Sequence, residues 1–257
     1  MVRLTGALPI HVPVRRDNYH PDFDALEAHV TENTKAIILN TPNNPTGAVY
    51  TPEETQRLVD FAVKHDLWIL DDMIYSTLVW TDVGYTSPCA FEGGSERTIT
   101  IGGWSKGWAM TGWRLGWITG PTNVMDGVKV VNVSSATHVP TFLMPAAAKA
   151  LSLEEEVQEM KDAFAERRVL MHQGLSSLPG FVVPEPEGAF YILCDITGTG
   201  LTDIEFAHQA LEHAQVQVIP GSLMKGGDGL IRISYATSIA NIHEGVRRLK
   251  EWLESRR

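Results

Sequence analysis

The sequence contains little cysteine, no long apolar run and little positive charge. Its two cysteines, Cys89 and Cys194, are far apart in unlike surroundings, so neither a disulfide framework nor a thiolate metal site is indicated. The first residues, MVRLTGALPIHVPV, lack the long apolar centre of a signal peptide, and no apolar run is long enough to span a bilayer. We therefore expect a protein of the reducing cytoplasm with no membrane partner.

The shortage of positive charge argues against a polyanionic partner. The chain has 21 Lys and Arg against 31 Asp and Glu, a formal net charge of -10. Its three pairs of adjacent arginines, at 15–16, 167–168 and 247–248, each lie among acidic or apolar residues rather than in a basic patch. We therefore expect no nucleic-acid partner.

The apolar residues are numerous enough for a large core, at 44% of 257 residues. Their spacing predicts a strand over 8–15, a short helix over 22–30, and further strands over 36–39, 67–70, 98–101 and 115–119. A helix begins after Thr51, because Pro52 suits the first helical position and Glu54 completes a capping box. Buried strands that alternate with a helix are typical of a parallel sheet covered by helices.

The second half of the chain has a different order of elements. We expect one long helix over about 145–178, strands over 181–183, 189–194, 216–219 and 230–235, and helices from about 202 and over 240–255. The predicted fold class is therefore α/β with a mostly parallel sheet. It divides into a larger α/β domain at 1–140 and, at 141–257, a linking long helix with a small α+β domain.

One lysine lies in an apolar, glycine-rich turn between two strand-like segments, in the stretch TITIGGWSKGWAMTGWRLGWITG at 98–120. Lys106 could extend its stem along the surface with its ammonium in water. Alternatively it could be partly desolvated, with a pKa low enough for the free amine to form a Schiff base with a carbonyl. Arg114 follows in a second glycine-flanked turn, where its guanidinium could bind a phosphate.

Polar residues also follow the predicted strands. Asn44 lies in the turn NTPNNPTG, at the carboxyl end of a strand, where open α/β sheets bind ligands, although Asn-Pro also suits a plain turn. Asp72 ends the next strand with Tyr75 three residues later; this is either a functional pair or an N-cap with a core tyrosine. Arg232 lies between two isoleucines, so it needs an anionic partner if buried and water if it lies on an edge strand.

Four motifs together resemble one protein family. NTPNNPTG, DDMIY, GGWSKGWAMTGWRLG and LIRISYA, in this order, resemble the class I/II aminotransferases, which are pyridoxal-phosphate enzymes of fold type I in the aspartate aminotransferase superfamily. The resemblance extends over nearly the whole chain. It implies a fold-type I architecture, amino acid and 2-oxo acid substrates, and a homodimer.

The resemblance also implies how these residues would hold pyridoxal 5'-phosphate. Lys106 would carry the internal aldimine, and Asp72 would pair with the pyridinium nitrogen, which keeps the ring protonated. Tyr75 and Asn44 would form hydrogen bonds to the phenolic oxygen of the ring. Arg114 would bind the cofactor phosphate.

For the substrate, the resemblance implies that Arg232 binds the α-carboxylate in a bidentate pair and that Asn44 lies beside it. Lys106, once displaced from the cofactor by the substrate, would move a proton between the substrate Cα and the cofactor. The implied reaction is a ping-pong transamination, in which an amino acid becomes a 2-oxo acid and a second pair then reacts in reverse.

The family pattern has an N-terminal portion that this sequence does not show, with a glycine-rich turn for the phosphate and an aromatic residue on the ring. Two hypotheses follow. The first is an aminotransferase whose gene start or sequence is truncated, or whose site is completed by another chain. The second is a catalytically incomplete fold-type I fragment that acts as a binding or interaction protein. A pyridoxal-phosphate-dependent lyase is a third possibility, because fold does not fix function.

Overall fold

The computed structural model describes residues 2–256, which form two compact units. Unit 1 contains the residues up to Thr34, Leu170–Glu185, and the residues from Ile192 onward. Unit 2 contains Lys35–Val169 and the short segment Pro186–Tyr191. Each unit thus consists of more than one segment of the chain. The division into domains at 1–140 and 141–257 stays a prediction.

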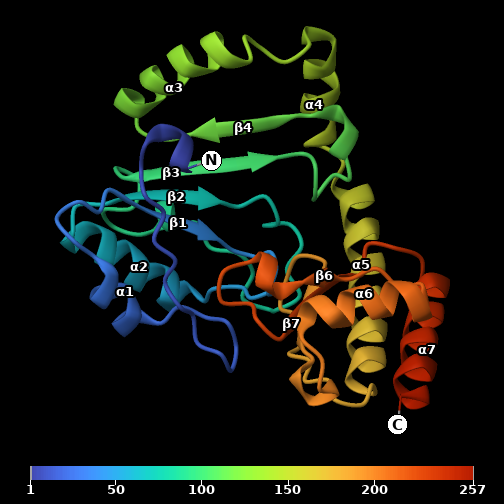
Figure 1. The fold of residues 1–257 in the computed structure, drawn as a ribbon. Helices are drawn as coiled ribbons and strands as arrows, with labels where there is room; N and C mark the ends of the chain where they lie inside the picture. The colour runs from blue at the N-terminus through green and yellow to red at the C-terminus, as the bar shows by residue number, and fades with distance from the viewer. Residues whose placement is uncertain (1, 257) are drawn as a thin grey trace. The chain divides into compact units, whose positions relative to one another are not determined.

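Unit 2 is built on a four-stranded sheet. Its strands are β1 (Ala36–Asn40), β2 (Trp68–Asp72), β3 (Thr98–Gly103) and β4 (Gly116–Thr119), in that spatial order (Figure 1). The first three strands are parallel, and β4 pairs with β3 in the antiparallel direction. The predicted α/β class with a mostly parallel sheet is therefore confirmed.

Helix α2 (Pro52–Lys64) connects β1 to β2 and begins as the sequence predicts. The Thr51 side chain accepts a hydrogen bond from the Glu54 backbone N–H, and the Glu54 carboxylate accepts one from the Thr51 N–H. On its apolar face, Leu58, Val59 and Ala62 are each at most 2% exposed. Burial of this face fixes the helix on the sheet, and with it the turn that precedes the helix.

The end of α2 is held by an arginine from a distant part of the chain. The Arg97 guanidinium donates hydrogen bonds to the carbonyl oxygens of Ala62 and Leu67, at 3.3 and 3.0 Å, and its Nε donates to Gly93 at 3.2 Å. The last carbonyls of a helix lack intrahelical partners and attract positive charge. Arg97 therefore joins the end of α2 to the start of β3.

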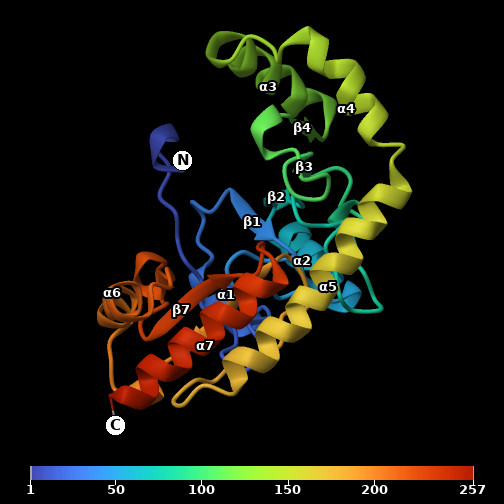
Figure 2. The ribbon, with the colours of Figure 1, turned by 90° about the vertical axis from the view of Figure 1, so that its right-hand side faces the viewer.

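The helices after β4 differ from the prediction. Helix α3 (Thr122–Ser135), which the sequence analysis did not predict, lies beside β4 in both views (Figures 1 and 2) and buries none of its residues. The single long helix predicted over 145–178 is wrong. The chain forms α4 (Met144–Ala150), breaks at residues 151–153, and continues as α5 (Glu154–Ser176).

Unit 1 has a three-stranded sheet in the order β5 (Tyr191–Asp195), β7 (Leu230–Ser234), β6 (Ile219–Pro220). Its helices are α1 (Phe23–His29), α6 (Asp203–Ala214), α7 (Ile239–Ser255) and the end of α5 from Leu170 onward. Helix α6 packs on α7 and on β6. Short 3-10 helices complete the two units: η1 (Val2–Thr5), η2 (Pro88–Ala90), η3 (Thr111–Trp113), η4 (Thr141–Leu143), η5 (Thr197–Thr199) and η6 (Gly221–Leu223).

The strand predicted over 8–15 is wrong. The residues from 7 to 13 have no regular structure, and Val14 forms only an isolated bridge with Pro21. Pro9 and Pro13 interrupt the apolar alternation, and proline has no N–H to donate to a neighbouring strand. The alternation of Leu8 and Ile10 therefore produces exposed side chains rather than a buried strand face.

Both cysteines are free thiols: Cys89 is exposed, and Cys194 is buried in β5. Burial raises the pKa of the Cys194 thiol, which keeps it protonated and unreactive. Within residues 2–256, none of the helices combines the length and apolar character that a crossing of the bilayer requires.

The contacts of Arg97 lead to a first prediction. Arg97→Ala leaves the carbonyls of Ala62, in α2, and of Leu67, beyond its end, without their charged donor. We therefore expect the free energy of unfolding to fall by about 2 kcal/mol, as urea denaturation would measure. Asp66→Asn is the matched control, because it removes only the 3.5 Å ion pair of Arg97 with a carboxylate that is 99% exposed. We expect the control to change stability by less than about 0.5 kcal/mol. Equal losses in the two variants would contradict this account.

Candidate active site

Three turns meet at one edge of the unit 2 sheet, because β1, β2 and β3 run in the same direction. Asn40, the last residue of β1, lies opposite Asp72 at the end of β2, and Asp72 lies opposite Ile101 in β3. The turns that contain Asn44 and Lys106 follow β1 and β3. The carboxyl edge of a parallel sheet is the usual ligand site in open α/β folds.

Asn40 joins two of these turns, a role that the sequence analysis missed. Its side-chain amide donates to the Asp72 carbonyl oxygen at 3.1 Å, and its side-chain oxygen accepts from the Asn44 backbone N–H at 3.0 Å. The Asn43 amide in turn donates to the Asn40 carbonyl at 3.1 Å. The one signal in the sequence is an amide side chain at the end of a strand, just before a turn.

Asp72 is half-buried at the end of β2. Its Oδ1 accepts a hydrogen bond from the Ile74 N–H at 3.3 Å. Desolvation raises the pKa of Asp72, and the bond from Ile74 opposes that rise. Because burial penalises the ionised carboxylate, a cationic group placed beside Asp72 would gain a strong electrostatic partner.

Tyr75 lies one short turn after Asp72 and is 4% exposed. Its hydroxyl lies 3.3 Å from the hydroxyl of Tyr191 and forms a side-chain hydrogen bond with Asn44. Burial raises the pKa of Tyr75. The phenol therefore keeps its proton at neutral pH and can donate it in a hydrogen bond.

Lys106 lies in the turn after β3 and is half-buried. Its Nζ lies 6.0 Å from the ring centroid of Tyr75 and 5.7 Å from that of Phe190, distances at which an ammonium is attracted to an aromatic ring. The phenol and the lysine thus belong to one cluster, and Phe190 is a member of it that the sequence analysis missed.

Two tryptophans fix this turn on α4. The indole N–H of Trp104 donates to the Ala147 carbonyl at 3.1 Å, and that of Trp108 donates to the Ala150 carbonyl at 2.9 Å. Helix α4 ends at Ala150, where the carbonyl groups have no further helical partner. The Ala150 carbonyl also accepts from the Leu153 N–H at 3.2 Å, so the bond from Trp108 is a second one at the end of the helix.

The turn is packed too closely for a side chain at Gly107. A Cβ at this position would lie 2.2 Å from Thr77 Oγ1 and 3.2 Å from Thr77 Cβ. Thr77 Oγ1 is itself buried without a hydrogen-bond partner among the described residues. Lys106 therefore projects from a backbone that is pressed against the segment containing Tyr75.

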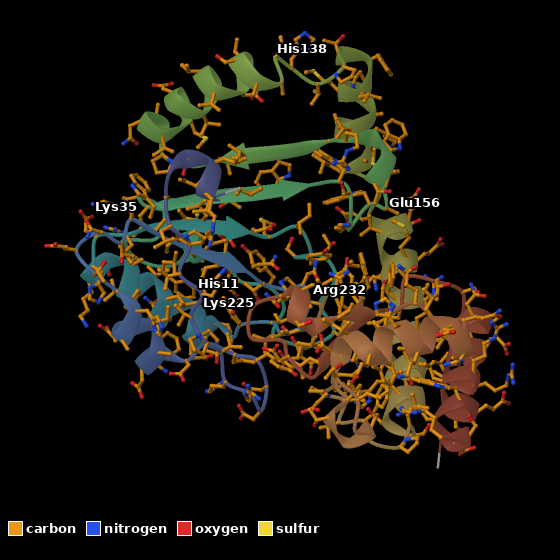
Figure 3. The ribbon with its side chains drawn as sticks, viewed as in Figure 1. His11, Lys35, His138, Glu156, Lys225 and Arg232 are labelled. Atoms are coloured by element: carbon orange, nitrogen blue, oxygen red, sulfur yellow. The ribbon has the colours of Figure 1, made fainter. Side chains whose placement is uncertain are left out.

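The two arginines predicted for the site come from other segments of the chain, Arg114 from unit 2 and Arg232 from unit 1. Arg114 is exposed, adopts a left-handed backbone conformation with φ 55°, and donates from Nη1 to the Thr111 carbonyl in its own turn at 2.9 Å. Arg232 lies on β7 of unit 1 (Figure 3), half-buried between Ile231 and Ile233. The structure thus brings together Asn44, Asp72, Tyr75 and Lys106. The roles of these four residues, like those of Arg114 and Arg232, stay predictions.

The four clustered side chains fit the ring of pyridoxal phosphate by their chemistry. An amine suits its aldehyde, a desolvated carboxylate suits its protonated ring nitrogen, and a phenol with an amide suits its phenolic oxygen. These groups come from three separate turns, and the hydrogen bonds of Asn40 hold two of those turns in register.

A second buried carboxylate lies next to Asp72 in the chain. Asp71 is fully buried and accepts a hydrogen bond from the Tyr85 hydroxyl at 2.5 Å. Its other oxygen has no hydrogen-bond partner among the residues that the structure describes. Desolvation raises the pKa of Asp71 to about 6, against the bond from Tyr85, which lowers it.

The family model described as aminotransferase class I and II matches residues 1–249. An aspartate aminotransferase of Pyrococcus abyssi is 40% identical over 261 residues, and aromatic-amino-acid aminotransferase 2 of Thermococcus litoralis is 41% identical over 261 residues. Both alignments cover 100% of this chain and 67% of the relative. The chain thus spans about two thirds of the length of these relatives.

Solved structures agree with these relatives. The aromatic aminotransferase from Pyrococcus horikoshii superimposes with a TM-score of 0.93 at 39% identity, over 96% of this chain and 68% of that one. The Thermus thermophilus aspartate aminotransferase with maleate gives a TM-score of 0.92 at 34% identity, over 98% and 65%. The predicted fold-type I architecture is therefore confirmed.

The packing around Gly107 gives a prediction. We expect Gly107→Ala to lower the free energy of unfolding by about 1–3 kcal/mol, because its Cβ would overlap Thr77. The double variant with Thr77→Ala should recover most of this loss. Gly112→Ala is the matched control, because its Cβ would meet no atom within 4 Å, and it should change stability by less than about 1 kcal/mol. A loss that Thr77→Ala does not relieve would contradict the proposed overlap.

Asp71 gives a prediction about pH. Its pKa is about 6 in the fold against an ordinary value of 3.8, so the folded protein holds a proton that the unfolded chain releases between these values. The contribution of Asp71 to stability is therefore largest at low pH, falls as pH rises through about 6, and is level above that.

Asp71→Asn lacks this titration. We therefore expect the stability of the variant relative to the wild type to increase by about 2–3 kcal/mol between about pH 4 and 7. Urea denaturation of both proteins across this range measures the difference, in which groups that titrate alike in both proteins cancel. A difference that does not vary with pH would mean that Asp71 keeps an ordinary pKa in the fold.

Proposed function

Because this chain belongs to the class I and II aminotransferases, we propose that it acts in the pyridoxal-phosphate-dependent transfer of an amino group from an amino acid to a 2-oxo acid. The reaction follows a ping-pong order. One amino acid leaves as its 2-oxo acid before a second 2-oxo acid binds and accepts the amino group.

The observation that carries this proposal is the convergence of Asn44, Asp72, Tyr75 and Lys106 at one edge of a parallel sheet. Bound pyridoxal phosphate supplies an aldehyde for attachment and a protonated ring that accepts the electron pair of the substrate Cα–H bond. Lys106 is the amine that attaches the cofactor and, when free, the base that moves a proton at the substrate Cα.

The other three residues adjust the charge of the ring. Asp72 holds the proton on the ring nitrogen, because its desolvated carboxylate gains a cationic partner there. Tyr75 donates its proton toward the phenolic oxygen, and the Asn44 amide donates beside it. Each interaction favours the protonated ring nitrogen together with an ionised phenolic oxygen, the form that withdraws electrons most strongly.

The substrate and partner assignments follow the family. Arg232 is proposed to bind the substrate α-carboxylate through its planar pair of donors, and Arg114 the cofactor phosphate. The named relatives act on aspartate or aromatic amino acids, and we propose amino acid and 2-oxo acid substrates without choosing between these classes. A homodimer and a cytoplasmic location are proposed on the same grounds.

Trapping the cofactor on the protein tests the proposal. Pyridoxal phosphate added to the protein should give a visible absorption band, and reduction with borohydride followed by peptide mapping should place the cofactor on Lys106. Lys106→Ala should lose both signals. Lys149→Ala, which removes an exposed lysine of α4, is the matched control and should keep them.

Product analysis then separates transamination from the two alternatives. With an amino donor and 2-oxoglutarate, transamination yields glutamate, whereas a lyase that catalyses β-elimination yields ammonia and pyruvate. A binding or interaction protein yields neither product. A band that survives Lys106→Ala, or label on another lysine, would contradict the assignment of Lys106.

A further inference from the structure

The phenol of Tyr75 has a second neighbour besides Asn44. The hydroxyl of Tyr191 lies 3.3 Å from the Tyr75 hydroxyl, and either oxygen can be the donor. The two residues are 116 positions apart in the chain. Their rings meet edge to face, with centroids 5.9 Å apart at 84°.

The position of Tyr191 is fixed by the segment that it ends. Within Pro186–Tyr191, the backbone N–H groups of Glu187 and Gly188 donate to the Gly47 carbonyl at 2.9 and 2.7 Å. The Glu187 carboxylate accepts from the Val49 N–H at 2.8 Å. Both partners of the Tyr75 phenol, Asn44 and Tyr191, therefore come from segments that are bonded to each other.

A second set of bonds ties this segment to the residues that follow Tyr75. The Trp80 N–H donates to the Glu187 carbonyl and the Ala189 N–H donates to the Leu78 carbonyl, both at 2.8 Å. A Cβ at Gly188 would lie 2.9 Å from that Leu78 carbonyl, so the two strands of chain approach closely. Tyr75 and Tyr191 thus face each other across a fixed backbone frame.

A phenol carries one proton and can accept two hydrogen bonds. When Tyr75 donates to Tyr191, its only proton is used within the pair. When Tyr191 donates instead, the Tyr75 oxygen accepts from Tyr191 and from Asn44, and its own proton is directed to a third group. An anionic acceptor near Tyr75 favours this second arrangement, because successive hydrogen bonds polarise one another.

We propose that Tyr191 is a positioning residue for the cofactor site, which acts by donating a hydrogen bond to Tyr75 so that the Tyr75 proton points to the phenolic oxygen of the cofactor. This inference rests on the proposed function. It predicts that Tyr191 stabilises the ionised phenolic oxygen without touching it. A residue that only packed against Tyr75 would have no such effect, since phenylalanine would pack equally well.

The test compares Tyr191→Phe with the wild type by pH titration of the absorption band of bound pyridoxal phosphate. Loss of one hydrogen bond should raise the pH midpoint by roughly 0.5–1 unit. In a protein that already carries Tyr75→Phe, adding Tyr191→Phe should leave the pH midpoint unchanged, because Tyr191 acts through the Tyr75 hydroxyl and that hydroxyl is gone. Tyr50→Phe is the control, since it removes a phenol that lies beside Glu54, and its midpoint should equal that of the wild type.

A second readout needs no cofactor. In the cofactor-free protein labelled with carbon-13 at tyrosine Cζ, the Tyr75 resonance, identified by its loss in Tyr75→Phe, should shift in Tyr191→Phe and stay in place in Tyr50→Phe. If Tyr191→Phe leaves the Tyr75 resonance in place, the proposed role of Tyr191 is overturned, while the proposed function is not. The same holds if Tyr191→Phe forms the absorption band with the pH midpoint of the wild type. A wild-type protein that forms no band contradicts the proposed function and this role together.

Discussion

The candidate site depends on the parallel pairing of β1, β2 and β3, which ends three strands at one edge of a sheet. The pairing alone brings the turns near each other; the side chain of Asn40 then fixes two of them, because it bonds the end of β2 and the turn of Asn44 at once. A shift of β1 by one residue would turn Asn40 to the other face of the sheet and break both bonds. The chemistry proposed for Asp72 and Asn44 therefore rests on strand register.

The lysine turn is held by close packing rather than by charge. Trp104 and Trp108 bond the carbonyls of α4, and Gly107 lies against Thr77 with no room for a methyl group. Such a frame keeps the Lys106 amine near the aromatic rings of Tyr75 and Phe190 and costs little reorganisation when a ligand binds. The hydrogen bonds of the two tryptophans and the packing at Gly107 thus both hold the Lys106 turn in place before a ligand binds.

Local signals predicted much of this arrangement. The apolar strands and the capping box of α2 predicted the sheet and its helix, and the resemblance of four motifs predicted the fold type; the roles of the four clustered residues stay predictions. Long-range contacts were not predicted: Trp108 donates to the last carbonyl of α4 from 42 positions away, and the Tyr191 hydroxyl lies beside that of Tyr75, 116 positions away. Helix α3 was missed because its valines have low helix propensity, and the alternation at 8–15 misled because prolines prevent pairing there.

The central claim is that the side chains at the sheet edge are already arranged for pyridoxal phosphate before it binds. Crystal structures of the protein with and without the cofactor test this claim most directly. We expect Asn44, Asp72, Tyr75 and Lys106 to keep their backbone positions within about 1 Å, with the cofactor joined to Lys106 and its ring nitrogen beside Asp72. A cofactor bound elsewhere, or a rearranged edge of the sheet, would contradict it.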